Sequence, residues 1–218
     1  MMTLQQLLNF PAAPEVALLF MTCVVLLLEL FVKQKNSLLT YTASQLSLLI
    51  SLVLVSHLYR IPAQLLFHQH YIWDLVAYFI KLSILFFSIF AFVYARDALK
   101  HLGINSGEYY LLGLFSILGM LVLTSANSLL TLYLGLELLS FPLYALVALQ
   151  RKPSDAAEAA MKYFILGALA SGLFLYGLSL LYGATHSLII PTINQVLLQG
   201  GQSPILLTTG LVFIVAGI

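Results

Sequence analysis

Residues 134–144 read LGLELLSFPLY, and this stretch places one glutamate, Glu137, inside a run of otherwise apolar side chains. The same apolar character extends over the whole chain of 218 residues, of which 61% are hydrophobic and only 8% are charged. A soluble domain usually has about 25% charged residues. The composition therefore predicts an all-α membrane protein, built as a polytopic bundle of transmembrane helices.

The chain contains seven apolar stretches, and six of them reach the length of about 20 residues that a membrane span needs. These six are residues 13–32, 37–58, 75–95, 108–126, 128–149 and 157–182. The seventh, PILLTTGLVFIVAGI at 204–218, has 15 residues and is still apolar where the sequence stops. A chain end inside hydrocarbon would leave a terminal carboxylate and unpaired carbonyls in lipid. We therefore expect an incomplete seventh span in a piece of a longer protein, rather than a re-entrant segment.

Lysine and arginine are unevenly divided between the loops. The loops after the first, third and fifth spans hold six of them, against one, Arg60, in the other loops; the six are Lys33, Lys35, Arg96, Lys100, Arg151 and Lys152. The positive-inside rule then places these three loops in the cytoplasm and the N-terminus outside. The net charge of +1 gives no basic surface for nucleic acid. A single cysteine, Cys23, can form no internal disulfide and cannot hold an iron–sulfur cluster.

The polar loop at residues 60–74 reads RIPAQLLFHQHYIWD. His68 and His70 have a spacing that some metal sites use, but no third ligand is evident beyond one aspartate. We interpret this segment as an interfacial loop, with Tyr71 and Trp73 at the level of the lipid headgroups.

Ionisable residues inside spans need an explanation, because a charge at the bilayer centre costs about 2.5–3.5 kcal/mol. Glu29 lies near the end of its span, four residues before Lys33, and an i,i+4 pair would satisfy it. Lys81 lies two turns into the third span. We expect its amine to extend outward or to pair with Asp74.

Lys162 follows a typical helix start, formed by Pro153, Asp155 and Glu158. It lies about 10 Å along the helix from that start, with Glu158 four residues earlier in the favourable order for an ion pair. Two interpretations stay open. One is a simple salt bridge near the cytoplasmic interface, and the other is a buried lysine whose proton affinity its neighbours tune.

Glu137 is the tenth residue of a span of 22, close to the midplane. A polar stripe continues its helix face through Tyr133, Ser140 and Tyr144. Pro142 cannot donate to the carbonyl four residues earlier, which predicts a kink and a freed carbonyl beside the carboxylate. Without a partner the buried group would be neutral, and beside a lysine it would ionise, so it has the property that a proton relay needs. The alternative is a protonated glutamate that only bonds across a helix interface.

The sixth span carries small residues at i,i+4 spacing, which allow close helix approach: Gly167 with Ser171, and Ala168 with Gly172. Such packing would bring Lys162 toward the fifth span. Glu137 and Lys162 still differ in depth by roughly 8–12 Å. We therefore expect water or a third residue to bridge them.

Two strings carry a resemblance to a known family: LYLGLELLSFPLYALVAL and RKPSDAAEAAMKYFILGALASGLFLYGLSLLYG. They resemble the N subunits of bacterial NADH:quinone oxidoreductase (complex I), the counterparts of mitochondrial NADH dehydrogenase subunit 2. The resemblance is specific over residues 108–183. It implies an antiporter-like fold, related to membrane subunits of Mrp-type cation/proton antiporters, with two inverted repeats of five helices. Residues 1–107 would then be N-terminal transmembrane helices 1–3, and 108–218 the truncated start of the first repeat, helices 4–7.

The same resemblance implies the site residues. Glu137 matches the family's glutamate of the fifth helix, and Lys162, in EAAMKYF, matches its lysine of the sixth. Both would belong to a central polar axis that moves protons, with Glu158 as the partner of Lys162. The family's next lysine lies beyond Ile218.

The implied function is that of a proton-translocating membrane subunit, which couples electron transfer from NADH to quinone to proton pumping. The subunit would act as part of a translocase in the bacterial inner membrane, with the other membrane subunits of complex I and the lipid bilayer as partners. It would bind no cofactor itself, because NADH, FMN, iron–sulfur clusters and quinone would belong mainly to partner subunits. Two alternatives stay open: an Mrp-type cation/proton antiporter subunit, and a structural membrane scaffold in which Glu137 tolerates neutral replacement.

Overall fold

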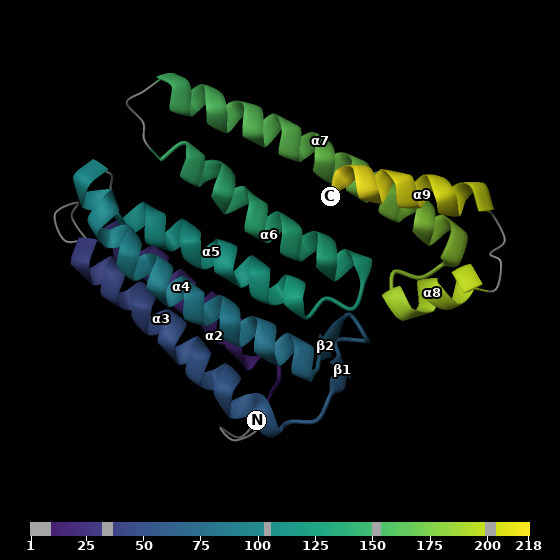
Figure 1. The fold of residues 1–218 in the computed structure, drawn as a ribbon, viewed down its shortest axis with the longest axis horizontal. Coiled ribbons are helices and arrows are strands. Elements are labelled where there is room, and N and C mark those ends of the chain that lie inside the picture. Colours follow the sequence, from purple (N-terminus) through teal and green to yellow (C-terminus); the bar gives the residue numbers. More distant parts are fainter. Residues whose placement is uncertain (1–9, 32–36, 103–105, 150–153, 199–203) are drawn as a thin grey trace.

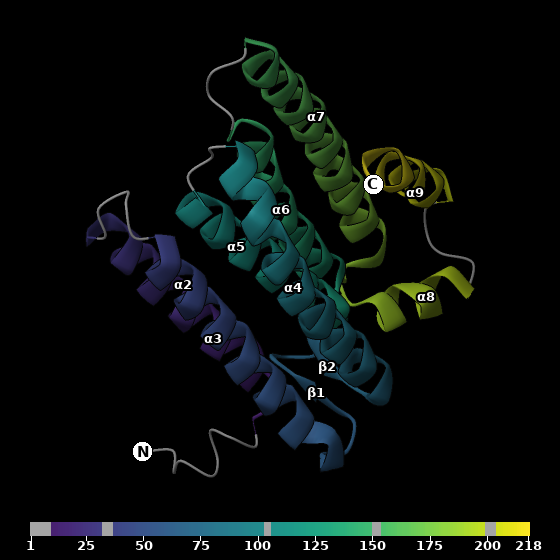
Figure 2. The same cartoon turned by 60° about the vertical axis from the view of Figure 1, so that its left-hand side comes forward.

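The computed structural model describes residues 10–31, 37–102, 106–149, 154–198 and 204–218. Six long helices run side by side in both views (Figure 1, Figure 2): α2 (Ala13–Phe31), α3 (Ser37–His57), α4 (Leu75–Leu102), α5 (Ser106–Thr124), α6 (Leu129–Val147) and α7 (Ser154–Thr185). Two shorter helices follow, α8 (Ile190–Leu198) and α9 (Pro204–Gly217). Between α3 and α4 lie one helical turn, η1 (Leu58–Arg60), and two strands, β1 (Gln64–Leu66) and β2 (Tyr71–Trp73).

Within the described residues, the six long helices are long and apolar enough to cross a membrane, which confirms the predicted spans. Most bounds agree with the prediction to within a few residues. The exception is α4, which continues to Leu102, seven residues beyond the predicted end. Its last two turns hold Arg96, Asp97 and Lys100. These charged residues end an apolar pattern but do not end a helix, because Ala, Leu, Arg and Lys are all good helix formers.

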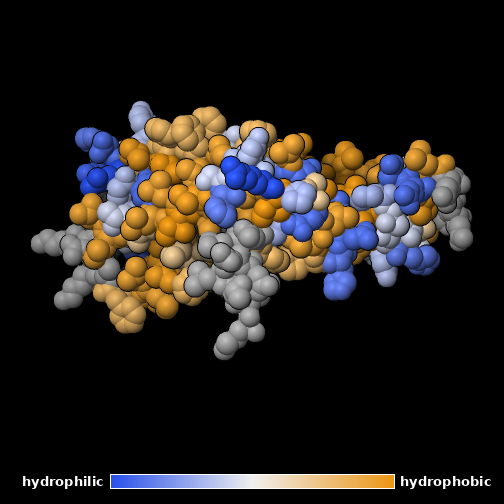
Figure 3. All heavy atoms as spheres, turned by 90° about the horizontal axis from the view of Figure 1, so that it is seen from below, coloured by the Kyte–Doolittle hydropathy of each residue, from blue (hydrophilic) through white to orange (hydrophobic). Residues whose placement is uncertain are grey.

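Apolar packing is centred on α5, which contacts α2, α3, α4 and α6. Its side chains Tyr110, Leu114 and Leu121 are fully buried. A second, smaller cluster joins α7 to α9 around Phe174 and Leu207. The exterior is apolar as well, and Figure 3 shows one face on which hydrophobic side chains predominate, as expected for a surface in contact with lipid.

The segment predicted as an interfacial loop contains an antiparallel hairpin, in which Gln64 pairs with Trp73 and Leu66 with Tyr71. Tyr71 and Trp73, which we expected at the level of the lipid headgroups, are only 6% and 2% exposed, so their rings pack inside the protein. Alternate residues of a strand point to the same face. The hairpin therefore turns both rings inward, against α4.

Candidate functional site

Helix α6 positions the central carboxylate. It begins at a conventional N-cap, where the side chain of Ser128 accepts a hydrogen bond of 3.2 Å from the backbone N–H of Thr131. Glu137 then lies near the middle of the helix, which continues through the buried Pro142. From α5, the hydroxyl of Ser116 lies 3.4 Å from the carbonyl oxygen of Leu139, next to the carbonyl that the proline leaves without its usual donor.

Glu137 faces α7, where the hydroxyl of Ser171 donates a hydrogen bond to its Oε1. The sequence singled out Ser171 only as a small residue for helix packing. Glu137 is half-buried, and this bond links α6 to α7 inside the membrane-spanning region. Ser171 is thus a site residue that sequence reasoning missed, and the i,i+4 pairing with Gly167 was its one signal.

The two helices enclose a cavity of about 220 Å³ around the carboxylate. The residues of the polar stripe on α6 all line this cavity: Tyr133, Glu137, Ser140 and Tyr144. From α7 come Tyr163, Gly167 and Ser171, and Gly217 and Ile218 close one side. The arrangement gathers one carboxylate and several hydroxyl groups inside a transmembrane bundle.

Gly167 makes room for one of these hydroxyls, because a Cβ at this position would overlap the Tyr144 hydroxyl. The ring of Tyr144 also packs edge-on against Tyr163, with ring centroids 4.7 Å apart. The predicted close approach at Gly167 therefore exists. It serves to seat the tyrosine of α6 over the backbone of α7.

Lys162 does not reach this cavity. Its side chain is 71% exposed and forms an ion pair of 2.5 Å with Glu158, one turn earlier on α7. Ser171, which contacts Glu137, lies nine residues further along, or about 13–14 Å by helix rise. Within the described residues, no hydrogen bond or ion pair joins Lys162 to Glu137, in keeping with the predicted difference in depth.

Lys81 has a different partner from the one predicted. Its side chain is fully buried and pairs with Glu15 of α2, instead of extending outward or bonding Asp74. Asp74 caps α4, where its Oδ1 accepts a hydrogen bond of 2.7 Å from the backbone N–H of Ala77. The correct partner depends on how α2 packs beside α4, which no local spacing reveals.

The remaining predictions on single side chains have mixed outcomes. Glu29 accepts a hydrogen bond from Thr40, and its predicted partner Lys33 lies outside the described residues. The Nδ1 atom of His70 lies 2.7 Å from the hydroxyl of Ser128. In the part of the chain that the structure describes, no three His, Cys, Asp or Glu side chains are placed to hold a metal ion.

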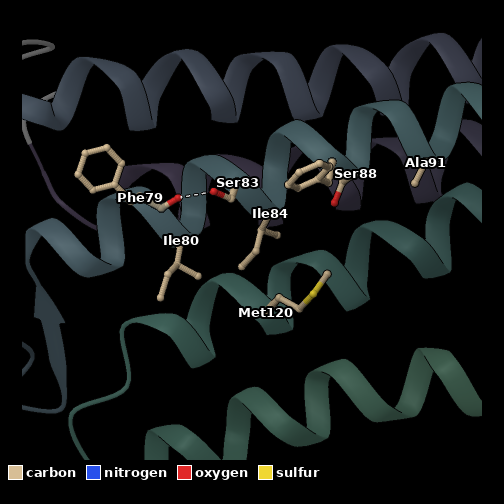
Figure 4. A pocket seen from close by; sticks show the side chains of 8 residues that line it. Phe79, Ile80, Ser83, Ile84, Ser88, Ala91 and Met120 are labelled. Atoms are coloured by element: carbon tan, nitrogen blue, oxygen red, sulfur yellow. Dashed lines mark hydrogen bonds between the residues drawn. The ribbon is translucent and has the colours of Figure 1, made fainter.

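A second hollow, of about 520 Å³, lies on the surface between α4 and α5 (Figure 4). Half of its lining residues are Phe or Ile, and none of them is ionisable. The hydroxyl of Ser83 donates to the carbonyl oxygen of Phe79 at 2.8 Å, so this polar group is satisfied within its own helix. The groove therefore has the character of a lipid-facing surface.

Comparisons with known proteins agree with this architecture. The family described as NADH:quinone oxidoreductase/Mrp antiporter, TM, matches residues 126–218. The chain is 44% identical to NADH-quinone oxidoreductase subunit N of Nitrosomonas europaea and 46% identical to that of Halorhodospira halophila, each over 208 residues. Each alignment covers 95% of this chain but 43% of the relative. The chain thus spans less than half the length of these relatives.

Two solved structures share the fold. One is respiratory complex I from Thermus thermophilus with bound Aureothin, with 30% identity and a TM-score of 0.74 over 94% of this chain and 42% of the matched chain. The other is the membrane-bound sulfane sulfur reductase, an archaeal respiratory membrane complex. Its TM-score is 0.77 over 95% of this chain and 43% of the matched chain, and at 23% identity the likeness concerns the fold alone.

Proposed function

We propose that this chain, which belongs to the family of NADH-quinone oxidoreductase subunit N and corresponds to the N-terminal part of its members, carries part of a proton path. The whole subunit would couple electron transfer from NADH to quinone to proton pumping. The observation that carries the proposal is Glu137, an ionisable group in the middle of a transmembrane helix and inside a polar cavity. Ionisable residues at this depth are rare and typically mark ion or proton pathways.

Glu137 would take up and release the proton, and Ser171 would serve both of its states. A serine hydroxyl can donate to a carboxylate and can also accept from a carboxylic acid. The hydroxyls of Tyr133, Ser140 and Tyr144 line the same cavity, whose volume of about 220 Å³ has room for a few water molecules. These groups offer a proton several short steps between donors and acceptors.

Lys162 would act as a second proton carrier or modulator, with Glu158 as its local partner. Because about 13–14 Å of helix separates it from Ser171, transfer between the two sites needs intermediate groups. We take the exposed face of α7 that carries Lys162 as a surface against which the rest of the longer subunit packs. Such packing would bury the ion pair and make its charge state responsive to its surroundings.

The family suggests the partners, the cofactors of the complex and the membrane in which the subunit lies. We propose that the partners are the other membrane subunits of complex I and the lipid bilayer, and that NADH, FMN, iron–sulfur clusters and quinone are bound by other subunits. The resemblance to bacterial members suggests the bacterial inner membrane, and the loop charges favour an N-terminus on the outside. Residues 108–218 would begin the first antiporter-like repeat, after the N-terminal helices in 1–107.

The two candidate functions differ in what drives proton movement: NADH oxidation in the first, and an ion gradient in an Mrp-type antiporter. The test uses inverted membrane vesicles from cells that express the full-length subunit, with a strain lacking the subunit as control. We expect NADH to drive acidification that depends on the subunit, and an imposed sodium gradient alone to drive none. Subunit-dependent proton movement under a sodium gradient without NADH would favour the antiporter instead.

A further inference from the structure

A buried charged pair lies away from Glu137, between the first and third long helices. Lys81 of α4 is fully buried, and Glu15, in the first turn of α2, is 7% exposed. The ammonium of Lys81 contacts Oε1 of Glu15 and donates a hydrogen bond of 2.8 Å to the hydroxyl of Tyr71. The proton path proposed above uses none of these groups.

The hydroxyl of Tyr71 has two alternative acceptors. Its oxygen lies 3.0 Å from the carbonyl oxygen of Pro11 and 3.1 Å from Oε1 of Glu15, and it has one hydrogen to donate. Burial, together with the nearby Glu15 carboxylate, raises the pKa of Tyr71 above its ordinary value. The side chain therefore stays a neutral hydroxyl that can change partner without changing charge.

The two carboxylate oxygens of Glu15 have different surroundings. Oε1 lies within hydrogen-bond distance of Lys81 and Tyr71, whereas Oε2 is buried and has no hydrogen-bond partner among the described residues. A static buried ion pair is stable only when further hydrogen bonds satisfy its remaining polar atoms. Oε2 instead offers a place where a proton can add without breaking either bond to Oε1.

Burial disfavours the charge of Lys81, and contacts other than Glu15 offset part of that cost if Glu15 becomes neutral. The Nζ of Lys81 lies 4.8 Å from the centroid of the Tyr71 ring and 5.1 Å from that of the Trp73 ring, within the range of a cation–π interaction. Asp74, at the start of α4, adds an attractive charge. Among the described residues, Glu15 and Asp74 are the acidic groups that act on this lysine.

We propose that Glu15, Lys81 and Tyr71 form a second proton-binding site. One proton from water adds to Oε2 of Glu15 and gives a neutral carboxylic acid, so the charge of the pair rises from zero to +1 and stays on Lys81. The Tyr71 hydroxyl then turns from Glu15 to the carbonyl of Pro11. Release of the proton to water reverses both changes.

The hairpin connects this site to the helix that carries Glu137. Next to Tyr71, the backbone N–H of Ile72 donates to the carbonyl of Ser125 at 2.9 Å, and the N–H of Asn127 donates to the carbonyl of His70 at 3.1 Å. These bonds hold the turn between α5 and α6, which ends at the N-cap of α6. The hairpin that carries Tyr71 is therefore bonded directly to the segment that leads into α6.

The test rests on the proposed function for its readout of proton pumping. In the full-length subunit within its native complex, the double variant Glu15→Leu with Lys81→Met replaces both charged groups by apolar side chains of similar volume. A merely structural pair tolerates such a replacement. We expect assembly to persist and NADH-driven acidification to be lost, and acidification at the native level would overturn the proposal. The exposed pair on α4, changed as Asp97→Asn with Lys100→Met, is the matched control and should pump normally.

Two further measurements decide the matter if the double variant does not assemble. Tyr71→Phe removes only the hydroxyl, and it should impair pumping, so native pumping would contradict the proposal. Infrared difference spectra between two pH values should show a carboxylic acid band that Glu15→Gln removes, and its absence from the native complex would also contradict it. This band does not depend on pumping. A failure of Glu137 as a relay can therefore be told apart from a failure of this site.

Discussion

One hydrogen bond holds the carboxylate of Glu137 at the scale of single residues, and its donor is Ser171 on the neighbouring helix. A hydrogen bond to a charged group contributes about 1.5–3 kcal/mol. The bond also crosses between α6 and α7, so it fixes where the carboxylate lies within the cavity. The proposed proton path therefore involves this serine as well as the glutamate.

Replacing Ser171 by alanine should therefore slow proton pumping without preventing assembly. Loss of a bond of this kind corresponds to roughly a tenfold change or more in the population of the correctly placed carboxylate. The measurement is the rate of NADH-driven acidification by the complex with the full-length subunit. Ser171→Thr keeps the hydroxyl and should retain most of the rate. Ser179→Ala, two turns later on an exposed part of α7, is the control, and an equal loss in both alanine variants would contradict the role of Ser171.

The sequence revealed some of these residues and not others for physical reasons. Glu137 stood out because a carboxylate in an apolar span is costly. Ser171 did not, because serine is also a common small packing residue in membrane helices. The partner predicted for Lys81 was wrong, because Glu15 is 66 residues away in sequence and comes into contact with the lysine only through helix packing.

At the scale of elements, helix α7 meets α9 through glycines. A Cβ at Gly177 would lie 2.7 Å from the carbonyl oxygen of Gly210 and 2.8 Å from the backbone nitrogen of Ile214. Backbone atoms cannot move aside as flexible side chains do. Close contact of this kind is a main source of helix association in membranes, where lipid competes for every apolar surface.

Gly177→Ala should therefore destabilise the packing of α7 on α9, by about 1–3 kcal/mol if it behaves as other overpacked sites do. Gly172→Ala is the matched control on the same helix, because a Cβ there meets nothing within 4 Å. Thermal unfolding of the two variants in detergent makes the comparison. A lower midpoint for Gly177→Ala alone is expected, and equal midpoints would show that the two helices are not held together at this glycine.

The elements themselves were largely predictable. Long apolar stretches define the six spanning helices, and their existence and order followed from length and hydropathy. The hairpin could not be predicted, because its two strands have only three residues each, too few for an alternating pattern to be recognised. The inward direction of Tyr71 and Trp73 was missed for the same reason.

At the scale of the whole molecule, the N-terminal helices and the α6–α7 pair are joined through α5 and through the hairpin. Half of the residues in the apolar window of α5 are buried, against 11% for α6. Hydropathy could not show this difference, because lipid-facing and buried helices are equally apolar. The neighbours of each helix, and hence the central place of α5, required the structure.

Asn127 is the side chain through which the hairpin holds the turn between α5 and α6, since its Nδ2 donates to the carbonyl of Gln69 at 2.7 Å. Asn127→Ala should lower stability by about 1 kcal/mol, the usual contribution of such a bond. Asn194→Ala, at an exposed position of α8, is the control. Thermal unfolding in detergent measures both, and an unchanged midpoint for Asn127→Ala would indicate that the bond does not join the two parts.

The most direct test of the proton path is Glu137→Gln in the full-length subunit within its native complex. Glutamine keeps the shape of the side chain and cannot take up the proton. NADH-driven acidification is recorded against NADH oxidation in sealed vesicles, with Asp97→Asn on the exposed end of α4 as control. We predict that acidification falls while the complex still assembles and the control pumps normally. Acidification and oxidation both at the native level would contradict the path and leave Glu137 with a structural role only.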